Sequence, residues 1–591
     1  MTFWRPALAL ILFALTLPAQ PPHTMFPAVR GTKHMAGGGN PFEAMAGFRI
    51  LEQGGNAIDA GVAGTLAAVV TEQDHIGMGG EMPLIIKIAG KPVVVISGVG
   101  VAPAKATVEY YSKRMPEPWE RPDRLAPIPS MGIRAAITPG LVDGLLLALE
   151  KYGTMSFAQV AAPAIESADG WPASEIYSDY MRRLGQTLEL WPASQKFFYP
   201  TGTAAAPGEI VKMAPLAATL REMVAAEKKA RGNRAAKIRA IHDYFYKGPI
   251  AKRIAKFSEE NGGLIAYSDL ANFKAEVDEP RTTTYRGLVI NKPGFWTQGP
   301  VMLEMLNILE GFDLKKMGHN SPEYLHTVIE AAKLAFADRD RFYGDPKFSK
   351  IPEETLLSKE YAAERRKLID PAKASMESRP GALGASAPAS SNGPGKSANN
   401  DTTCVQAVDS KGNVFSATPS GAWLPSVIAG DTGIPFSVRL ESFVVTPGHA
   451  NQLGPGKRPR VTLSPTMVTT KEGDLYFTLS TPGGDNQDQA LLQVMLNIIE
   501  FGMTPQEAVE APRFQTDHFY ASFGNHEFTP GNVALENRIG RATADKLIAL
   551  GHKANLRPDW TNSSSPVVIM KKNGALHGAA DPRRSRFILG R

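Results

Sequence analysis

The chain has 591 residues, of which 43% are hydrophobic and 21% charged, a composition typical of a globular protein with a full hydrophobic core. This length allows one large domain or several smaller ones. The formal charge of +6 is small for the length, and the absence of a dense Lys/Arg run argues against a nucleic-acid-binding surface. The only cysteine is Cys404, so the chain has no intramolecular disulfide.

The first 20 residues have the pattern of a signal peptide. Arg5 supplies positive charge, residues 7–17 are an apolar run, and Pro18-Ala19-Gln20 puts a small residue at its end. The run is shorter than the about 20 residues that a membrane-spanning helix needs. We therefore predict a signal peptide over residues 1–20 and an exported protein, either periplasmic or secreted. An uncleaved membrane anchor is the alternative.

Helical patterns dominate between residues 140 and 340. Before them, residues 56–70 are rich in small apolar residues on every side, which predicts a helix buried in a core. Residues 322–342 have apolar positions at helical spacing, and Gly344-Asp345-Pro346 follows as a stop signal.

Strand patterns gather on the C-terminal side. Residues 405–408 and 413–417 flank Asp409-Ser-Lys-Gly412 and predict a β-hairpin. Residues 475–480 predict a further strand, which ends in Thr481-Pro482-Gly483-Gly484 and is followed by a helical pattern over residues 487–501.

Residues 380–400 consist almost wholly of Gly, Ala, Ser, Pro and Asn. Such a tract buries too little apolar surface to offset its chain entropy, so it predicts a flexible loop. An ordinary interdomain linker is one interpretation. Because Asp401-Thr402-Thr403 follows the tract and leads into the predicted hairpin, a loop that is cut during maturation is the other.

Thr402 is a candidate nucleophile. A threonine hydroxyl reacts poorly unless a base lies beside it, and a cut before the threonine would free its own α-amine for that task. The α-amine titrates near pH 7.7–8.0, so a useful fraction is unprotonated at neutral pH. The neighbouring Cys404 is the competing nucleophile, but it lacks a local cysteine-protease signature, and a small buried core residue is its ordinary role.

Gly483 and Gly484 are candidates for an oxyanion hole. Adjacent glycines between a strand and a helix let backbone N–H groups converge on a developing negative charge, which the helix N-terminus also favours. A plain strand-to-helix turn is the alternative. The sequence shows no metal-ligand spacing, phosphate loop or nicotinamide fingerprint, and His34, His75 and His577 stand alone, which predicts packing or surface roles and neither a metal nor a cofactor.

Taken together, these residues resemble the γ-glutamyltranspeptidase family over nearly the whole chain after residue 20. The matching segments are, in chain order, Gly54-Gly55-Asn56-Ala57-Ile58-Asp59-Ala60, Gly77-Met78-Gly79-Gly80, Thr138-Pro139-Gly140, Asn261-Gly262-Gly263-Leu264-Ile265, Ala337-Asp338-Arg339, Asp401-Thr402-Thr403, Lys457-Arg458-Pro459, Ser464-Pro465-Thr466, Pro482-Gly483-Gly484, Ala511-Pro512-Arg513-Phe514 and Asp581-Pro582-Arg583.

The resemblance implies an α+β fold, a four-layer αββα sandwich of the N-terminal nucleophile hydrolase type. It implies self-cleavage between Asp401 and Thr402, which gives a large subunit of residues 21–401, with a processing loop at 376–401, and a small catalytic subunit of residues 402–591. The family's motif positions imply that Thr402 is the nucleophile and that Gly483 and Gly484 form the oxyanion hole. They also imply that Ser420 replaces the family's threonine that hydrogen-bonds the nucleophile. The expected partners are the two subunits of one precursor and a small amide or peptide substrate. We expect no binding to nucleic acid and, after the signal peptide is removed, no binding to a membrane.

Departures from the family pattern cluster where its members bind the glutamyl group. Val99 stands in place of the arginine that pairs with the α-carboxylate, and Ala422, Arg439 and Ser442 replace the Asn, Gln and Asp around the ammonium. Arg439 would put positive charge beside the substrate's ammonium, so we expect it to bind a carboxylate or carbonyl instead, with pairing to Glu441 or exposure to solvent as the alternative. Glu441, Ser442 and Thr462 complete the predicted substrate site, Val461-Thr462 standing where the family has a Ser-Ser pair.

These departures resemble the divergent branch that contains oxamate amidohydrolase. The family-default function is hydrolysis or transfer of γ-glutamyl amides such as glutathione through a threonyl acyl-enzyme. One alternative is an amidohydrolase for a carboxylate-bearing acyl group without the α-amine, of oxamate or glutaryl type. An exported binding protein without turnover is the other.

Overall fold

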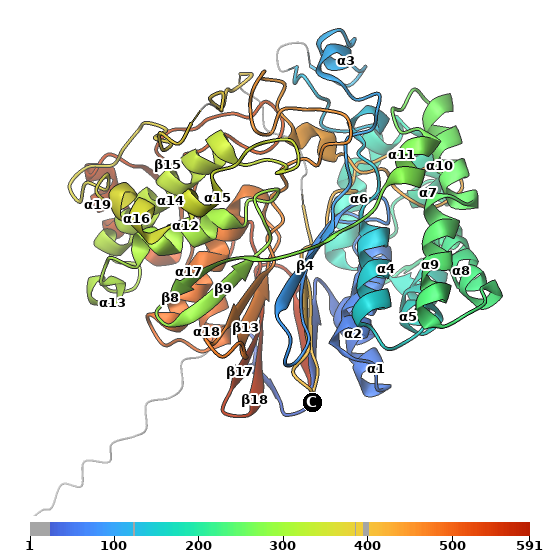
Figure 1. The fold of residues 1–591 in the computed structure, drawn as a ribbon, viewed down its shortest axis with the longest axis horizontal. Helices are drawn as coiled ribbons and strands as arrows, with labels where there is room; N and C mark the ends of the chain where they lie inside the picture. The colour runs from blue at the N-terminus through green and yellow to red at the C-terminus, as the bar shows by residue number, and fades with distance from the viewer. Residues whose placement is uncertain (1–23, 122–124, 385, 394–400) are drawn as a thin grey trace, which may run out of the picture.

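The computed structural model describes residues 24–121, 125–384, 386–393 and 401–591. Two β-sheets lie face to face between two layers of helices, as Figure 1 shows, which confirms the predicted αββα sandwich. The predicted signal peptide, residues 1–20, lies outside the described residues.

Each large sheet has seven strands. In order across sheet A they are β1 (Val29–Gly31), β18 (Ala575–Ala580), β17 (Val567–Lys572), β13 (Leu475–Ser480), β12 (Thr466–Thr469), β9 (Leu288–Lys292) and β8 (Arg281–Tyr285). In order across sheet B they are β19 (Phe587–Gly590), β2 (Met35–Gly38), β10 (Val405–Val408), β11 (Val414–Ala417), β3 (Met82–Lys87), β4 (Val93–Gly98) and β7 (Val277–Asp278). Smaller sheets are formed by β14 (Phe514–Thr516), β15 (Asn532–Glu536) and β16 (Lys553–Arg557), and by β5 (Trp171–Pro172) and β6 (Ile210–Val211).

The helices divide between the two outer faces. On the side of sheet B are α1 (Pro41–Glu52), α2 (Ala57–Thr71), α4 (Leu141–Tyr152), α5 (Phe157–Asp169), α6 (Glu175–Leu188), α7 (Pro192–Phe198), α8 (Ala214–Lys229), α9 (Arg234–Tyr246), α10 (Pro249–Glu260) and α11 (Tyr267–Asn272). The short helix α3 (Val108–Ser112) lies apart from both layers, at the top of the view in Figure 1. On the side of sheet A are α12 (Pro300–Leu309), α13 (Leu314–Met317), α14 (Pro322–Phe342), α15 (Glu353–Leu356), α16 (Lys359–Arg366), α17 (Gln487–Ile499), α18 (Pro505–Glu510) and α19 (Arg541–Ala549).

The hydrophobic core has a layer for each interface of the sandwich. One cluster joins sheet B to its helices and a second joins sheet A to its helices. A third lies between the sheets, with Val408 and Val414 from sheet B against Met467 and Ile569 from sheet A. Since both sheets are covered on both faces, strands such as β3, β10 and β11 are buried along their whole length.

The helices expected from the sequence form with small changes at their ends. The α2 helix spans Ala57–Thr71 and is buried along its whole length, and the Asn56 side chain caps it by accepting from the N–H groups of Ile58 and Asp59. The α14 helix has the expected bounds, and α17 ends at Ile499, two residues before the expected end.

The predicted hairpin is β10 and β11, which pair antiparallel. Its second strand begins at Val414 because Asn413 belongs to the turn, where its backbone and side-chain N–H groups both donate to the Asp409 carboxylate at 3.0 and 2.7 Å.

The described part of the predicted loop, residues 376–384 and 386–393, contains neither helix nor strand. It contacts the body of the protein, since Gly381 N–H donates to Asp338 at 2.6 Å and Asn392 N–H donates to the Asn525 carbonyl at 2.8 Å. Its flexibility stays a prediction.

Sheet B interleaves strands from the two sides of the Asp401–Thr402 bond. The order β19-β2-β10-β11-β3 places β2, from near the N-terminus, between two strands that follow residue 401. Backbone ladders join β2 to both β10 and β19, so a chain cut at this bond would remain one sheet. None of the helices in the described part of the chain combines the length and apolarity needed to cross a membrane.

Candidate active site

The β10–β11 hairpin brings Thr402 and Ser420 together. Val405 pairs with Ala417, and three residues farther along the same register Thr402 and Ser420 form a β-bridge. The Thr402 Oγ1 and Ser420 Oγ atoms are 3.0 Å apart, and Thr402 is 3% exposed. The predicted contact between these two hydroxyls is therefore present.

Three groups converge on the Ser420 hydroxyl. It donates its one proton to the Asp401 carbonyl oxygen at 2.8 Å, and it accepts from Arg439 Nη2 at 3.1 Å. Because that proton is used, Thr402 is the donor in the Thr402–Ser420 hydrogen bond. At the peptide bond between Asp401 and Thr402, the Ser420 hydroxyl therefore donates a hydrogen bond to the carbonyl oxygen, and the Thr402 hydroxyl donates to Ser420.

The Asp401 side chain is held by two cationic groups. His75 Nε2 lies 3.0 Å from its carboxylate, and Arg584 makes a second ion pair with it. Burial alone would raise the pKa of Asp401, but Arg584 and His75 hold it well below its ordinary value. Burial alone would lower the pKa of His75, but the carboxylates of Asp401 and Asp74 raise it well above its ordinary value.

The expectation of an isolated packing or surface role for His75 was wrong. Its partner Asp401 is more than 300 residues away in the chain, so single-sequence reasoning did not join them. The available signal was the polar run Glu72-Gln73-Asp74-His75 directly after a fully buried helix, where charged residues are costly unless they have partners.

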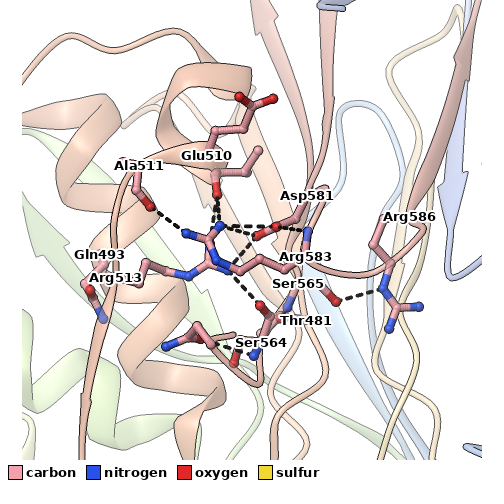
Figure 2. A network of polar contacts seen from close by, with 12 residues as sticks. Thr481, Gln493, Glu510, Ala511, Arg513, Ser564, Ser565, Asp581, Arg583 and Arg586 are labelled. Carbon is pink, nitrogen blue, oxygen red and sulfur yellow. Dashed lines mark hydrogen bonds and ion pairs between the residues drawn. The ribbon is translucent and has the colours of Figure 1, made fainter. Parts of the chain in front are cut away.

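Arg584 belongs to the loop between β18 and β19, and Figure 2 shows the polar contacts of its neighbours Asp581, Arg583 and Arg586. Arg513 donates to Asp581 at 2.6 Å, and Arg583 N–H donates to the same carboxylate at 2.8 Å. At the loop's other end, Arg586 Nε donates to Ser565 Oγ at 2.9 Å. The family-like motif Asp581-Pro582-Arg583 therefore positions the arginine that follows it.

Gly483 and Gly484 lie between β13 and α17, and both have positive φ, 122° and 56°. A Cβ on Gly483 would come within 2.3 Å of Ser564 Oγ, so glycine is required there. Among the described residues the N–H groups of these glycines have no hydrogen-bond acceptor. Both glycines line a cavity of about 340 Å³ together with Asp401 and Arg584, which suits the predicted oxyanion role.

Arg439 is 1% exposed and pairs with Glu81, so the alternative interpretation, pairing with Glu441 or exposure to solvent, was wrong. Its guanidinium lies 4.4 Å from the ring centroid of Trp423 and 5.4 Å from that of Phe523, which hold it in place. Its Nη1 has no hydrogen-bond partner among the described residues. A spare donor on a buried guanidinium is suited to an acceptor that arrives with a ligand.

The other predicted substrate residues are buried, at 1% exposure for Glu441, Ser442 and Thr462. Ser442 lies one turn after Arg439 on the same 3-10 helix, Arg439–Ser442, so the two side chains share a face. The Ser442 and Thr462 hydroxyls lack partners among the described residues, whereas Glu441 accepts from Gly524 N–H at 3.3 Å. None of these described hydrogen bonds joins the three residues to Thr402.

Cys404 is fully buried between the sheets. Burial raises the pKa of its thiol to about 12. It therefore remains a thiol at neutral pH and is unsuited to nucleophilic attack.

His326, Glu330 and His552 bring three possible metal ligands together, which the sequence did not reveal because two of them are 226 residues apart. Their polar atoms already have partners: His326 Nδ1 lies 2.8 Å from His552 Nε2, and Lys333 Nζ lies 2.6 Å from Glu330. A buried ammonium within the group opposes a cation.

Comparisons with known proteins agree with this geometry. The family model described as gamma-glutamyltranspeptidase matches residues 44–590. The glutathione hydrolase proenzyme of Escherichia coli (strain K12) is 33% identical over 576 residues, 95% of this chain and 92% of that protein. The acylase ACY 1 proenzyme of Pseudomonas sp. (strain SE83) is 34% identical, over 93% of this chain and 92% of that protein.

Among solved structures, the cephalosporin acylase from Bacillus halodurans matches with a TM-score of 0.82 and 28% identity, covering 98% of this chain and 99% of that one. Fold, ordered motifs and relatives all agree, and the chain belongs to the γ-glutamyltranspeptidase family of hydrolases.

Proposed function

We propose that the chain cleaves itself between Asp401 and Thr402 and then hydrolyses amides through an ester on Thr402. The observation that carries this proposal is the hydroxyl pair at the scissile bond, with Thr402 Oγ1 3.0 Å from Ser420 Oγ and Ser420 Oγ 2.8 Å from the Asp401 carbonyl oxygen.

In self-cleavage, Thr402 Oγ1 attacks the Asp401 carbonyl carbon while its proton passes to Ser420. Ser420 gives its own proton to the developing oxyanion, and the adjacent Arg439 guanidinium favours negative charge on the pair. The C–N bond then breaks, the Thr402 nitrogen takes up a proton as an amine, and Asp401 remains as an ester. Water opens this ester and leaves a carboxylate on Asp401 and a free Thr402.

In the mature protein the Thr402 α-amine acts as the base and the N–H groups of Gly483 and Gly484 receive the oxyanion. The substrate acyl carbon bonds to Thr402 Oγ1 as the amide C–N bond breaks, and the leaving amine takes the proton. Water then opens the ester, which releases the acid and regenerates Thr402. Residues 21–401 and 402–591 become the two subunits, and the interleaved strands of sheet B support their remaining together. Export stays a prediction, since it rests on residues 1–20.

The charges near Thr402 favour an acyl group without an α-amine. Arg439 offers a free N–H donor where the family binds an ammonium, and like charges placed together cost several kcal/mol. The relatives include proteins named glutathione hydrolase and proteins named acylase, so both acyl classes occur among similar chains. We favour carboxylate-bearing amides of glutaryl or shorter type over γ-glutamyl amides. The hydroxyl pair and the open glycine N–H groups argue against a binding protein without turnover.

The test uses two substrates that differ only in the α-amine, γ-glutamyl 4-nitroanilide and glutaryl 4-nitroanilide. We expect intact mass and N-terminal sequencing to find a fragment that begins Thr402-Thr403-Cys404, absent in Thr402→Ala, and the cut protein to prefer the glutaryl anilide by at least about tenfold. Arg439→Gln should shift the preference toward γ-glutamyl. An uncut wild-type chain would contradict self-cleavage, whereas a cut chain that prefers γ-glutamyl would contradict only the acyl assignment.

A further inference from the structure

Two cationic side chains hold the carboxylate of Asp401, the residue directly before Thr402. We call Arg584 and His75 the Asp401 cradle. His75 Nε2 is 3.0 Å from the Asp401 carboxylate and Arg584 pairs with the same oxygen. Because Arg584 lines the cavity with Gly483 and Gly484, a carboxylate in the cradle lies at the edge of the space that would receive an acyl group.

The charges around the cradle balance only while Asp401 is present. Ion pairs at 3.0–3.4 Å link Glu72 to Arg586 and His75 to both Glu72 and Asp74, in addition to the two pairs of Asp401. The cationic groups are His75, Arg584 and Arg586, and the carboxylates are Asp401, Glu72 and Asp74.

Burial and the neighbouring Glu72 carboxylate raise the pKa of Glu43 well above its ordinary value, which favours the neutral form of Glu43. If Asp401 leaves, one positive charge is left in excess at a largely buried place. Such a charge is costly without a counter-ion, so the emptied cradle favours an anion.

Asp401 is also the acyl donor of the proposed self-cleavage. A substrate acyl group with the same spacing between carboxylate and reacting carbonyl as Asp401 should therefore fit beside Thr402. Its side-chain carboxylate is separated from its reacting carbonyl carbon by two carbons, Cα and Cβ. A succinyl group has this spacing, and the cavity of about 340 Å³ suits an acyl group of that size.

We infer that, once self-cleavage has released Asp401, Arg584 and His75 bind the carboxylate of the substrate's acyl group and select chains of succinyl length. This inference rests on the proposed function. It adds the carboxylate subsite that Val99 cannot provide, because Val99 is buried in the apolar layer between the sheets. The acyl carbon bonds to Thr402 Oγ1 as the amide C–N bond breaks, and the carboxylate in the cradle stays unchanged.

The first experiment compares succinyl 4-nitroanilide with succinamyl 4-nitroanilide, a neutral substrate of the same length. Wild-type cut protein should have a KM for the succinyl substrate that is lower by about tenfold or more, as expected for charge-assisted hydrogen bonds. Arg584→Gln should remove this difference by raising the KM for the succinyl substrate by about tenfold. Arg541→Gln, which changes an exposed arginine paired only with Asp545, is the matched control and should retain the difference.

A second measurement does not depend on how well the Arg584 variant cuts itself. Isothermal titration should show succinate binding to the cut wild-type protein and no binding to the uncut Thr402→Ala protein, in which Asp401 fills the cradle. Three results would overturn this inference and leave the proposed function standing. They are equal binding of succinate to both proteins, no binding of succinate to either, and equal KM values for the two anilides in a cut and active protein. An uncut wild-type chain would instead refute the proposed function.

Discussion

Replacing Ser420 with alanine removes the hydroxyl on which three groups around the Asp401–Thr402 bond converge. The Ser420 hydroxyl donates to the Asp401 carbonyl oxygen at 2.8 Å, its oxygen is 3.0 Å from the Thr402 hydroxyl oxygen, and it accepts from Arg439 Nη2 at 3.1 Å. The substitution therefore removes a donor from the developing oxyanion and an acceptor from the nucleophile in one step.

Loss of one preorganised oxyanion donor typically costs about 10²–10³ in rate, so we expect self-cleavage of Ser420→Ala to slow by at least this factor. Arg439 also loses an acceptor while it remains buried, which should lower the free energy of unfolding by about 1–3 kcal/mol. Ser420→Thr keeps the hydroxyl and should restore most of the rate.

The assay follows the fragment that begins at Thr402 by intact mass over time, in purified precursor at constant temperature. Urea unfolding of the same samples separates a slow chemical step from a misfolded chain. If folded Ser420→Ala cleaves within about threefold of the wild type, Ser420 neither polarises the carbonyl nor receives the Thr402 proton, and the reasoning is wrong.

Two further predictions concern the surroundings of the site. Gly483→Ala should lower the rate of hydrolysis by about 10² or more, because its Cβ would lie 2.3 Å from Ser564 Oγ at a φ of 122°. The control is Gly574→Ala, where φ is also positive but the space around the Cβ is open, and it should keep full activity in the same anilide assay. Burial alone would raise the pKa of Glu72, but Arg586 lowers it to about 2. The contribution of Glu72 to stability is therefore complete above pH 4.5, the ordinary pKa of a glutamate, and is lost as the pH falls from there toward 2. Urea unfolding from pH 7 to pH 3 should therefore show a smaller loss of stability in Glu72→Gln than in the wild type, and an equal loss would refute this assignment.

Local sequence patterns determined the individual elements and the reactive bond. The apolar run of α2, the stop signal after α14 and the turn residues Asp409 and Gly412 act over a few residues, so helix, strand and turn could be predicted from them. The hairpin register follows from the same local pattern, and it places Ser420 opposite Thr402. The tract before Asp401 predicted the proposed processing site for an equally local reason, its low apolar content.

Only the tertiary structure decided what surrounds that bond. Arg439 meets Glu81, 358 residues away, and Asp401 meets His75 and Arg584 from opposite ends of the chain. A buried charge must find a partner, but the sequence does not say which one, because the partner is chosen by how the sheets and loops pack. The sequence therefore determined the elements and the threonine that they present, while packing decided the charges around that threonine and, with them, the acyl groups that it would accept.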